Sequence, residues 1–192
     1  MRRIIAAVVA ALALAAPLPS AHASDGRVWE QLRSEDGVVV LFRHALAPGT
    51  GDPPEFQLGD CSTQRNLSAV GRAQARAMGA RFRQEGVPVT ALRSSRWCRA
   101  LDTARLMNLG IVVPTPALDS VFTASQARAD RQRVFTERII RAHRGAEGVA
   151  VLVGHQVNIT QLTGIAPTPG EGVVVRANAQ GRIEVLGTIP AP

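Results

Sequence analysis

Several residue types and motifs that mark common functional classes are scarce or missing in this chain of 192 residues. Tyrosine is absent, aromatic residues make up only 4% of the sequence, and no helix-turn-helix or zinc-finger spacing is present. Nucleic-acid-binding domains are usually recognised by such motifs together with a basic surface. The sequence therefore disfavours a nucleic-acid partner, although the chain is basic.

Motifs of two hydrolase classes are missing as well. The chain contains no H-x-x-x-H pair and no carboxylate cluster, which disfavours a metal-dependent hydrolase. It also contains no G-x-S-x-G turn, the motif that presents a nucleophilic serine in many hydrolases. A serine hydrolase that uses Ser94 or Ser95 with His155 is therefore a disfavoured alternative.

The positive charge of the chain points to an anionic partner. The net charge of +7 comes from arginine residues that are spread along the sequence with acids between them. An arginine guanidinium is planar and can bind two oxygens of a phosphate group at once. Hydrophobic residues make up 46% of the sequence, which is ordinary for a globular protein and argues against disorder.

The N-terminus has the pattern of a secretory signal peptide. Arg2 and Arg3 precede the apolar segment 4–16, and Ala21-His22-Ala23 fits an A-x-A cleavage site. The apolar segment is too short to span a membrane comfortably, and Pro17 interrupts it. An uncleaved membrane anchor is the alternative.

We therefore expect residues 1–23 to be a signal peptide and residues 24–192 to form one domain. The exported protein would be periplasmic or secreted, with no stable membrane anchor after cleavage of the signal. Outside the cytosol an even number of cysteines favours disulfide formation. Cys61 and Cys98, the two cysteines of the chain, are predicted to pair.

Two apolar runs predict buried parallel strands that are each followed by a histidine. Residues 37–42 and 148–153 are rich in valine and leucine and lack the polar alternation of a half-exposed strand. Arg43 and His44 end the first run, and His155 follows the second. Ligands of open α/β sheets bind beyond the carboxyl ends of the strands, so these side chains are candidate site residues.

The rest of the chain predicts a three-layer α/β/α domain with a mostly parallel central sheet. Further strands are expected at 89–92, 111–113, 173–175 and 183–186, and helices at 24–36, from 68 to about 86, within 94–104, at 124–143 and from about 158. Between these elements, residues 45–64 are rich in glycine, proline and aspartate and predict a loop. A loop of that length is usually functional, and this one follows His44 directly.

Four cationic or ionisable side chains are expected to converge at the carboxyl edge of the sheet. His44, His155 and Arg43 follow or end buried strands, and Arg99 lies in the turn after another strand. Two imidazoles and two guanidiniums around one crevice suit a phosphoryl group. One imidazole can attack phosphorus while the other groups hold the oxygens on which charge accumulates.

Four blocks of the sequence resemble the histidine phosphatase superfamily, also called phosphoglycerate-mutase-like. The R-H-G signature is present as R-H-A at 43–45, (N/D)-L-S-x-x-G at 66–71, S-x-x-x-R-A-x-x-T-A at 95–104, and the late G-H at 154–155. The blocks occur in the family order and cover most of the chain after the signal. The signal and the cysteine pair also resemble the exported branch that includes the lipopolysaccharide core heptose phosphatase.

The resemblance implies roles for individual residues. His44 would be the nucleophile that becomes phosphohistidine, Arg43 and Arg99 would clamp the phosphate, and His155 would complete the pocket. It also implies a phosphoglycerate-mutase-like fold, hydrolysis without a metal or another cofactor, and a small phosphorylated or phosphoglycan substrate. A non-catalytic anion- or glycan-phosphate-binding module on the same fold is the main alternative.

The chain departs from the family pattern in two places. Ala45 replaces the signature glycine, and segment 117–122 lacks the glutamate that many members use as general acid. Asp119 is the candidate for that acid. Other acids available in the long loop are Asp52, Glu55 and Asp60. Without a positioned acid, the enzyme would favour good leaving groups such as those of phosphohistidine, acyl phosphates or aryl phosphates.

Overall fold

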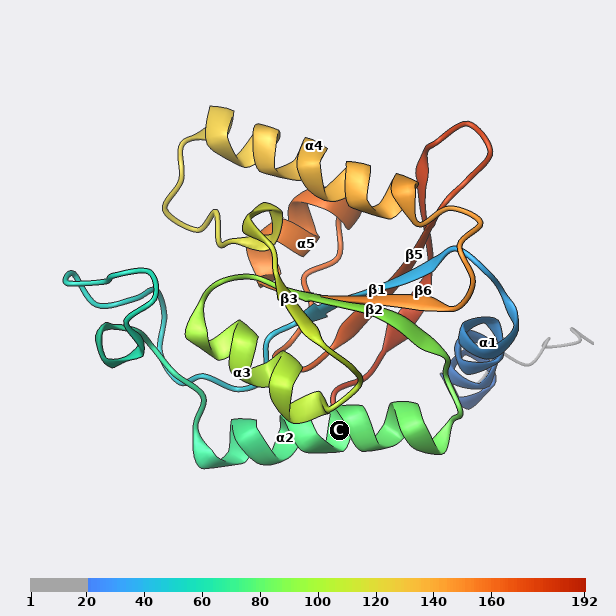
Figure 1. Cartoon of the computed structure of the whole chain (residues 1–192), viewed down its shortest axis with the longest axis horizontal. Helices are drawn as coiled ribbons and strands as arrows, with labels where there is room; N and C mark the ends of the chain where they lie inside the picture. The colour runs from blue at the N-terminus through green and yellow to red at the C-terminus, as the bar shows by residue number, and fades with distance from the viewer. Residues whose placement is uncertain (1–20) are drawn as a thin grey trace, which may run out of the picture.

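The computed structural model describes residues 21–192 and shows one six-stranded sheet between two layers of helices (Figure 1). The strands are β1 (Val38–Arg43), β2 (Val89–Ser94), β3 (Val112–Pro114), β4 (Val149–Gly154), β5 (Gly172–Ala177) and β6 (Ile183–Ile189). Their order across the sheet is β3-β2-β4-β1-β5-β6. The four strands from β3 to β1 run parallel, and β5 and β6 are antiparallel to their neighbours. The predicted mostly parallel sheet is thus confirmed.

The helices cover both faces of the sheet, as predicted for a three-layer α/β/α domain. They are α1 (Ala21–Ser34), α2 (Ala69–Gln84), α3 (Cys98–Met107), α4 (Gln126–Ala142) and α5 (Gln156–Thr163), with short 3-10 helices η1 (Cys61–Thr63) and η2 (Pro116–Leu118). Figure 1 shows α1, α2 and α3 on one side of the sheet and α4 and α5 on the other. Two hydrophobic clusters fill the spaces between these layers.

Strand β1 shows why the apolar runs lack polar alternation. Val38, Val40 and Phe42 belong to the cluster under α1, α2 and α3, whereas Val39 and Leu41 belong to the cluster under α4 and α5. Every one of these side chains is almost completely buried. Successive residues of a strand point to opposite faces, so a strand covered on both faces needs apolar residues at every position.

Some elements are longer than the sequence pattern predicted. Strand β2 continues to Ser94 because its parallel pairing with β4 extends to Val153. Helix α5 begins at Gln156 rather than near Asn158, since His155 is its N-cap residue and accepts the backbone hydrogen bond of Ile159. In both cases backbone hydrogen bonds extend the element through polar residues that carry no periodic signal.

The predicted signal peptide, residues 1–23, lies almost wholly outside the described residues. Cleavage of a signal and export of the protein therefore remain predictions. Within residues 21–192, no helix has the length and apolar character needed to cross a membrane.

Close packing of α2 against α3 requires a glycine at position 79. A Cβ atom at Gly79 would lie 1.8 Å from the carbonyl oxygen of Met107 at the end of α3. No side-chain rotation can relieve this contact, because it is made with the backbone of the neighbouring helix. The position of α3, the helix that carries Arg99, therefore depends on the close approach of Gly79 to Met107.

We expect Gly79→Ala to lower the free energy of unfolding by about 3 kcal/mol, because overpacking forces the two helices apart. Urea denaturation of both proteins measures the difference. Arg76→Ala, an exposed position on the same helix, is the matched control and should stay within about 0.5 kcal/mol of the parent. Equal stability of the glycine and alanine proteins would contradict the packing argument.

Candidate active site

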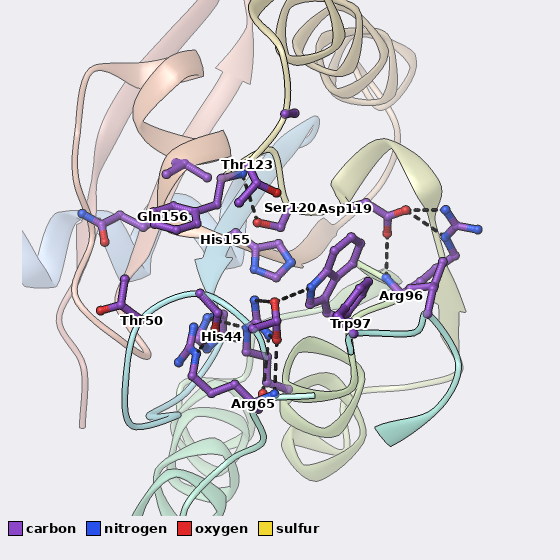
Figure 2. A pocket seen from close by; sticks show the side chains of 18 of the residues that line it. His44, Thr50, Arg65, Arg96, Trp97, Asp119, Ser120, Thr123, His155 and Gln156 are labelled. Carbon is purple, nitrogen blue, oxygen red and sulfur yellow. Dashed lines mark hydrogen bonds and ion pairs between the residues drawn. The ribbon is translucent and has the colours of Figure 1, made fainter. Parts of the chain in front are cut away.

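The carboxyl ends of neighbouring strands bring the predicted residues into one pocket. Strands β1 and β4 pair in register with Arg43 opposite Gly154, and the His44 amide donates a hydrogen bond to the Gly154 carbonyl at 2.9 Å. The rings of His44 and His155 consequently lie 5.4 Å apart, centroid to centroid. Figure 2 shows these two rings close together, with Trp97 beside them. Arg43, His44, Arg99 and His155 all line a cavity of about 590 Å³.

The side chain of His44 is held in one tautomer. Its Nδ1 lies 2.8 Å from the carbonyl oxygen of Ala45, and a carbonyl oxygen can only accept a hydrogen bond. The proton of the neutral ring is therefore on Nδ1, and Nε2 carries the lone pair. The Nε–H group of Arg99 points at this lone pair from 3.2 Å.

The pocket keeps His44 uncharged. Burial and, to a lesser extent, the charges of Arg99, Arg65 and Arg43 lower the pKa of its imidazole to about 3. The hydrogen bond to Ala45 opposes this shift in part. Near neutral pH the ring is therefore neutral, which is the form in which Nε2 can act as a nucleophile.

His155 is also buried and neutral. Burial is the main cause that lowers its pKa well below the ordinary value, and the charges of the nearby arginines act in the same direction. Its Nε2 is 2.8 Å from the hydroxyl oxygen of Ser95, a residue that directly follows β2. The Trp97 ring packs edge-on against His155 at a centroid distance of 5.6 Å.

Arg43 has a buried N–H group without a partner. Its NH1 group donates to the carbonyl oxygen of Pro167 at 3.1 Å, but its Nε has no hydrogen-bond partner among the described residues. Burial and the charge of Arg99 lower the pKa of Arg43. An unpaired buried donor is costly, and an oxyanion in the pocket would satisfy it.

Two site residues escape prediction from sequence patterns. Arg65 lines the pocket and donates to the carbonyl oxygens of Gly51 and Ala47, so it holds the long loop in place. Asp52 on that loop accepts two hydrogen bonds from Arg99 and one from the indole of Trp97. The only sequence signal for Asp52 is its place in an acid-containing loop after His44.

Asp119, the candidate general acid, is held by its own set of donors. Its carboxylate accepts hydrogen bonds from the backbone amide and the side chain of Arg96, each at 2.9 Å, and lies 3.5 Å from the Ser95 hydroxyl. Figure 2 shows the Asp119–Arg96 pair to one side of Trp97. Both carboxylate oxygens are engaged by Arg96, so the geometry favours a structural role.

The predicted disulfide joins the long loop to the helix that carries Arg99. Cys61 and Cys98 are bonded, with their Cα atoms 5.7 Å apart. Cys98 directly precedes Arg99, and its amide donates to the side-chain oxygen of Gln64 at 2.9 Å. The loop is thereby fixed against α3 on the same side as Asp52.

The start of α2 fixes the backbone just after His44. The Ser68 hydroxyl caps α2 by accepting from the amide of Gly71. A Cβ atom at Gly71 would lie 2.0 Å from the carbonyl oxygen of Leu46, so glycine allows this close approach. The amide of Ser68 donates to the same Leu46 oxygen at 3.1 Å.

No group of three or more potential metal ligands among histidine, cysteine, aspartate and glutamate is found in the described part of the chain. Arginines are the most numerous charged groups of the pocket, and its two carboxylates, Asp52 and Asp119, are each paired with one of them.

Comparison with known proteins shows what part of this chain and its fold are similar to. Residues 39–120 match the histidine phosphatase superfamily (branch 1), a segment that contains Arg43, His44 and Arg99 but ends before His155. The six-stranded sheet and its flanking helices match the phosphoglycerate-mutase-like fold of solved structures. A search of curated proteins found no match.

Solved structures share the fold at low sequence identity. A phosphoserine phosphatase from Entamoeba histolytica in complex with 3-phosphoglyceric acid is 12% identical, with a TM-score of 0.60, and 79% of this chain aligns with 95% of that one. A mycobacterial glucosyl-3-phosphoglycerate phosphatase is 18% identical (TM-score 0.57; 77% and 96% of the chains). The protein histidine phosphatase SixA, complexed with tungstate, is 16% identical (TM-score 0.53; 80% and 96%).

The low pKa of His44 predicts a pH-dependent stability. Between about pH 6 and pH 4 the unfolded chain protonates this imidazole, whose ordinary pKa is 6.5, whereas the folded chain, with a pKa of about 3, does not. The free energy of unfolding therefore falls as the pH is lowered through this range. In His44→Gln the fall should be shallower by about 1.4 kcal/mol per pH unit near pH 5. Urea denaturation at several pH values measures both slopes, and equal slopes would show that His44 is protonated in the folded protein.

Proposed function

We propose that the protein is a phosphomonoesterase that works through a phosphohistidine intermediate on His44. This proposal rests on the groups that surround Nε2 of His44. Nε2 of His44 is unprotonated, receives the Nε–H group of Arg99, and shares its pocket with Arg43, whose buried Nε has no partner among the described residues. A phosphoryl group placed there would meet a nucleophile and unpaired donors together.

The reaction that this geometry supports has two displacement steps. The lone pair of His44 Nε2 forms a bond to phosphorus, and the bond from phosphorus to the leaving-group oxygen breaks, with its electron pair going to that oxygen. A water oxygen then attacks phosphorus, the phosphorus–nitrogen bond breaks, and its electron pair returns to Nε2. The water loses a proton to solvent, and inorganic phosphate is released.

The arginines supply the electrostatic part of catalysis in this proposal. Charge is spread over the three equatorial oxygens in the transition state of phosphoryl transfer, and fixed cations there lower the barrier. Arg43 and Arg99 are the candidates to hold these oxygens, and His155 completes the wall beside His44. Because guanidiniums provide the positive charge, the proposed reaction needs no metal and no other cofactor.

Protonation of the leaving group is the step for which the pocket is poorly equipped. The two pocket-lining carboxylates, Asp52 and Asp119, are each ion-paired with an arginine. A leaving group that is stable as an anion needs no acid, so the proposal favours aryl or acyl phosphates over alkyl phosphates. Phosphohistidine also fits, because its imidazole can leave as a neutral ring when the other ring nitrogen carries a proton. The fold is shared with the protein histidine phosphatase SixA, which is consistent with a substrate of this kind.

Export and the branch of the family are part of the proposal. The signal-like N-terminus and the disulfide support a periplasmic or secreted enzyme, since disulfides persist in oxidising compartments. The same two features support the exported branch that includes the lipopolysaccharide core heptose phosphatase. A small phosphorylated or phosphoglycan substrate fits a cavity of about 590 Å³.

Binding without turnover is the second candidate function. The ion pairs of Asp52 and Asp119 favour it, because they leave the site without an evident proton donor. In that case the purified protein would bind vanadate but release no phosphate from any ester.

We expect His44→Asn to lower kcat/KM for an aryl phosphate at least about a thousandfold, because the nucleophile is lost. Trapping with radiolabelled substrate should yield an acid-labile, alkali-stable label on the parent and none on the variant. His143→Asn, a substitution at the C-cap of α4, is the control and should retain turnover and label. Undiminished turnover in His44→Asn would remove His44 from the role.

The missing proton donor predicts a strong dependence on the leaving group. We expect kcat/KM for p-nitrophenyl phosphate to exceed that for n-propyl phosphate at least about a hundredfold, since general acid catalysis contributes that much where it operates. Steady-state assays of phosphate release measure both values. Comparable values would mean that a carboxyl group, such as that of Asp119, delivers a proton after all.

A further inference from the structure

The carboxylate of Asp52 is hydrogen-bonded to Arg99, the buried arginine that contacts His44. Its Oδ1 accepts from Arg99 NH1 at 2.6 Å and its Oδ2 from Arg99 NH2 at 3.1 Å. The Trp97 indole donates to Oδ2 at 3.0 Å and the Arg65 amide to Oδ1 at 3.2 Å. The Arg99 side chain is only 3% exposed and the Asp52 side chain 15%, so solvent screens the pair weakly.

Two parallel hydrogen bonds from one guanidinium are the arrangement by which arginine binds either a carboxylate or a phosphate. Arg99 has three donor groups here: Nε faces His44 Nε2, and both terminal nitrogens face Asp52. A phosphoryl group that bonds to His44 must lie beside this guanidinium. The phosphoryl group would therefore approach terminal nitrogens of Arg99 that already bind the Asp52 carboxylate.

We propose that Asp52 is an internal counter-anion that competes with the phosphoryl group for Arg99. The proposal rests on the proposed function in that phosphate binds beside His44, and it adds a residue that sets how tightly phosphate is held. When an oxyanion enters, one of its oxygens replaces the Asp52 carboxylate on the terminal nitrogens of Arg99. The carboxylate then stays close to a dianion and repels it.

The positive charges around the pocket explain why a competing carboxylate would be useful. Arg43, Arg65 and Arg99 lie close together, and burial first and then the charge of Arg99 lower the pKa of both other guanidiniums. Such a cluster would bind inorganic phosphate, the product, very tightly. A carboxylate at the centre of the cluster offsets one positive charge, so release of the product becomes easier.

The loop keeps the Asp52 carboxylate close to Arg99 even when an oxyanion displaces it. Arg65 donates to the carbonyl oxygen of Gly51, the residue next to Asp52, at 2.7 Å. The Cys61–Cys98 disulfide ties the far end of the loop to α3, one residue before Arg99. A group tethered on both sides has a high effective concentration at its partner, so it returns to Arg99 whenever the oxyanion departs.

Oxyanion binding to the full chain after signal removal tests the proposal directly. Vanadate and inorganic phosphate are titrated calorimetrically into the parent and into Asp52→Asn, which keeps the shape of the side chain but removes its charge. We expect the dissociation constants of both anions to fall at least about tenfold in the variant. Unchanged or weaker binding in Asp52→Asn would overturn the proposal.

Asp60→Asn is the matched control for loss of an acid from the same loop. Asp60 is exposed and caps η1 through Ser62, and asparagine is an equally good cap. Its dissociation constants should equal those of the parent. An equal tightening in Asp60→Asn would assign the effect to the net charge of the protein rather than to the contact with Arg99, and would also overturn the proposal.

A crystal structure of the parent with vanadate provides a test that needs no variant. We expect a vanadate oxygen on the terminal nitrogens of Arg99 and the Asp52 carboxylate displaced from them. Both carboxylate oxygens still bonded to Arg99 would refute the competition. A parent that binds vanadate but hydrolyses no ester would refute the enzymatic function alone, whereas turnover with unaltered binding in Asp52→Asn would refute this inference alone.

Discussion

The site depends on keeping the imidazole of His44 uncharged within a cluster of buried arginines. A guanidinium does not give up its proton near neutral pH. Repulsion among the positive charges therefore lowers the pKa of the histidines instead. Burial and the arginine charges together hold the pKa of His44 at about 3. The Ala45 carbonyl then fixes the one remaining ring proton on Nδ1. Positive charge and a neutral nucleophilic nitrogen can therefore lie within hydrogen-bond distance of each other.

The order of the strands explains why this arrangement comes from distant parts of the chain. In the sheet, β2, β4 and β1 are neighbours and run parallel, so their carboxyl ends meet at one edge. Ser95, His155 and His44 each follow one of these strands directly. The Ser95–His155 hydrogen bond and the 5.4 Å spacing of the two histidine rings are thus consequences of strand register. The flanking helices keep the strands buried, and α3 contributes Arg99.

Strand ends were predictable from sequence, and loop contacts were not. His44 and His155 follow apolar runs whose burial on both faces is visible in the sequence, so the sheet edge and their meeting could be derived. Asp52 lies in a segment without periodicity, and its contact with Arg99 spans 47 residues and depends on Arg65, on the disulfide and on Trp97. For Asp119, the decisive fact is the ion pair with Arg96, which no local pattern encodes.

The two carboxylates of the pocket have different roles because each neutralises a different arginine. Asp119 is almost completely buried and neutralises Arg96, a partner outside the imidazole pair, so it stabilises the turn after β2. Asp52 neutralises Arg99, which contacts Nε2 of His44. In the proposed competition, an anion that approaches His44 exchanges with Asp52 but not with Asp119. Such an exchangeable anion would offset repulsion among the arginines of the empty pocket and would keep the proposed enzyme from holding its product too firmly.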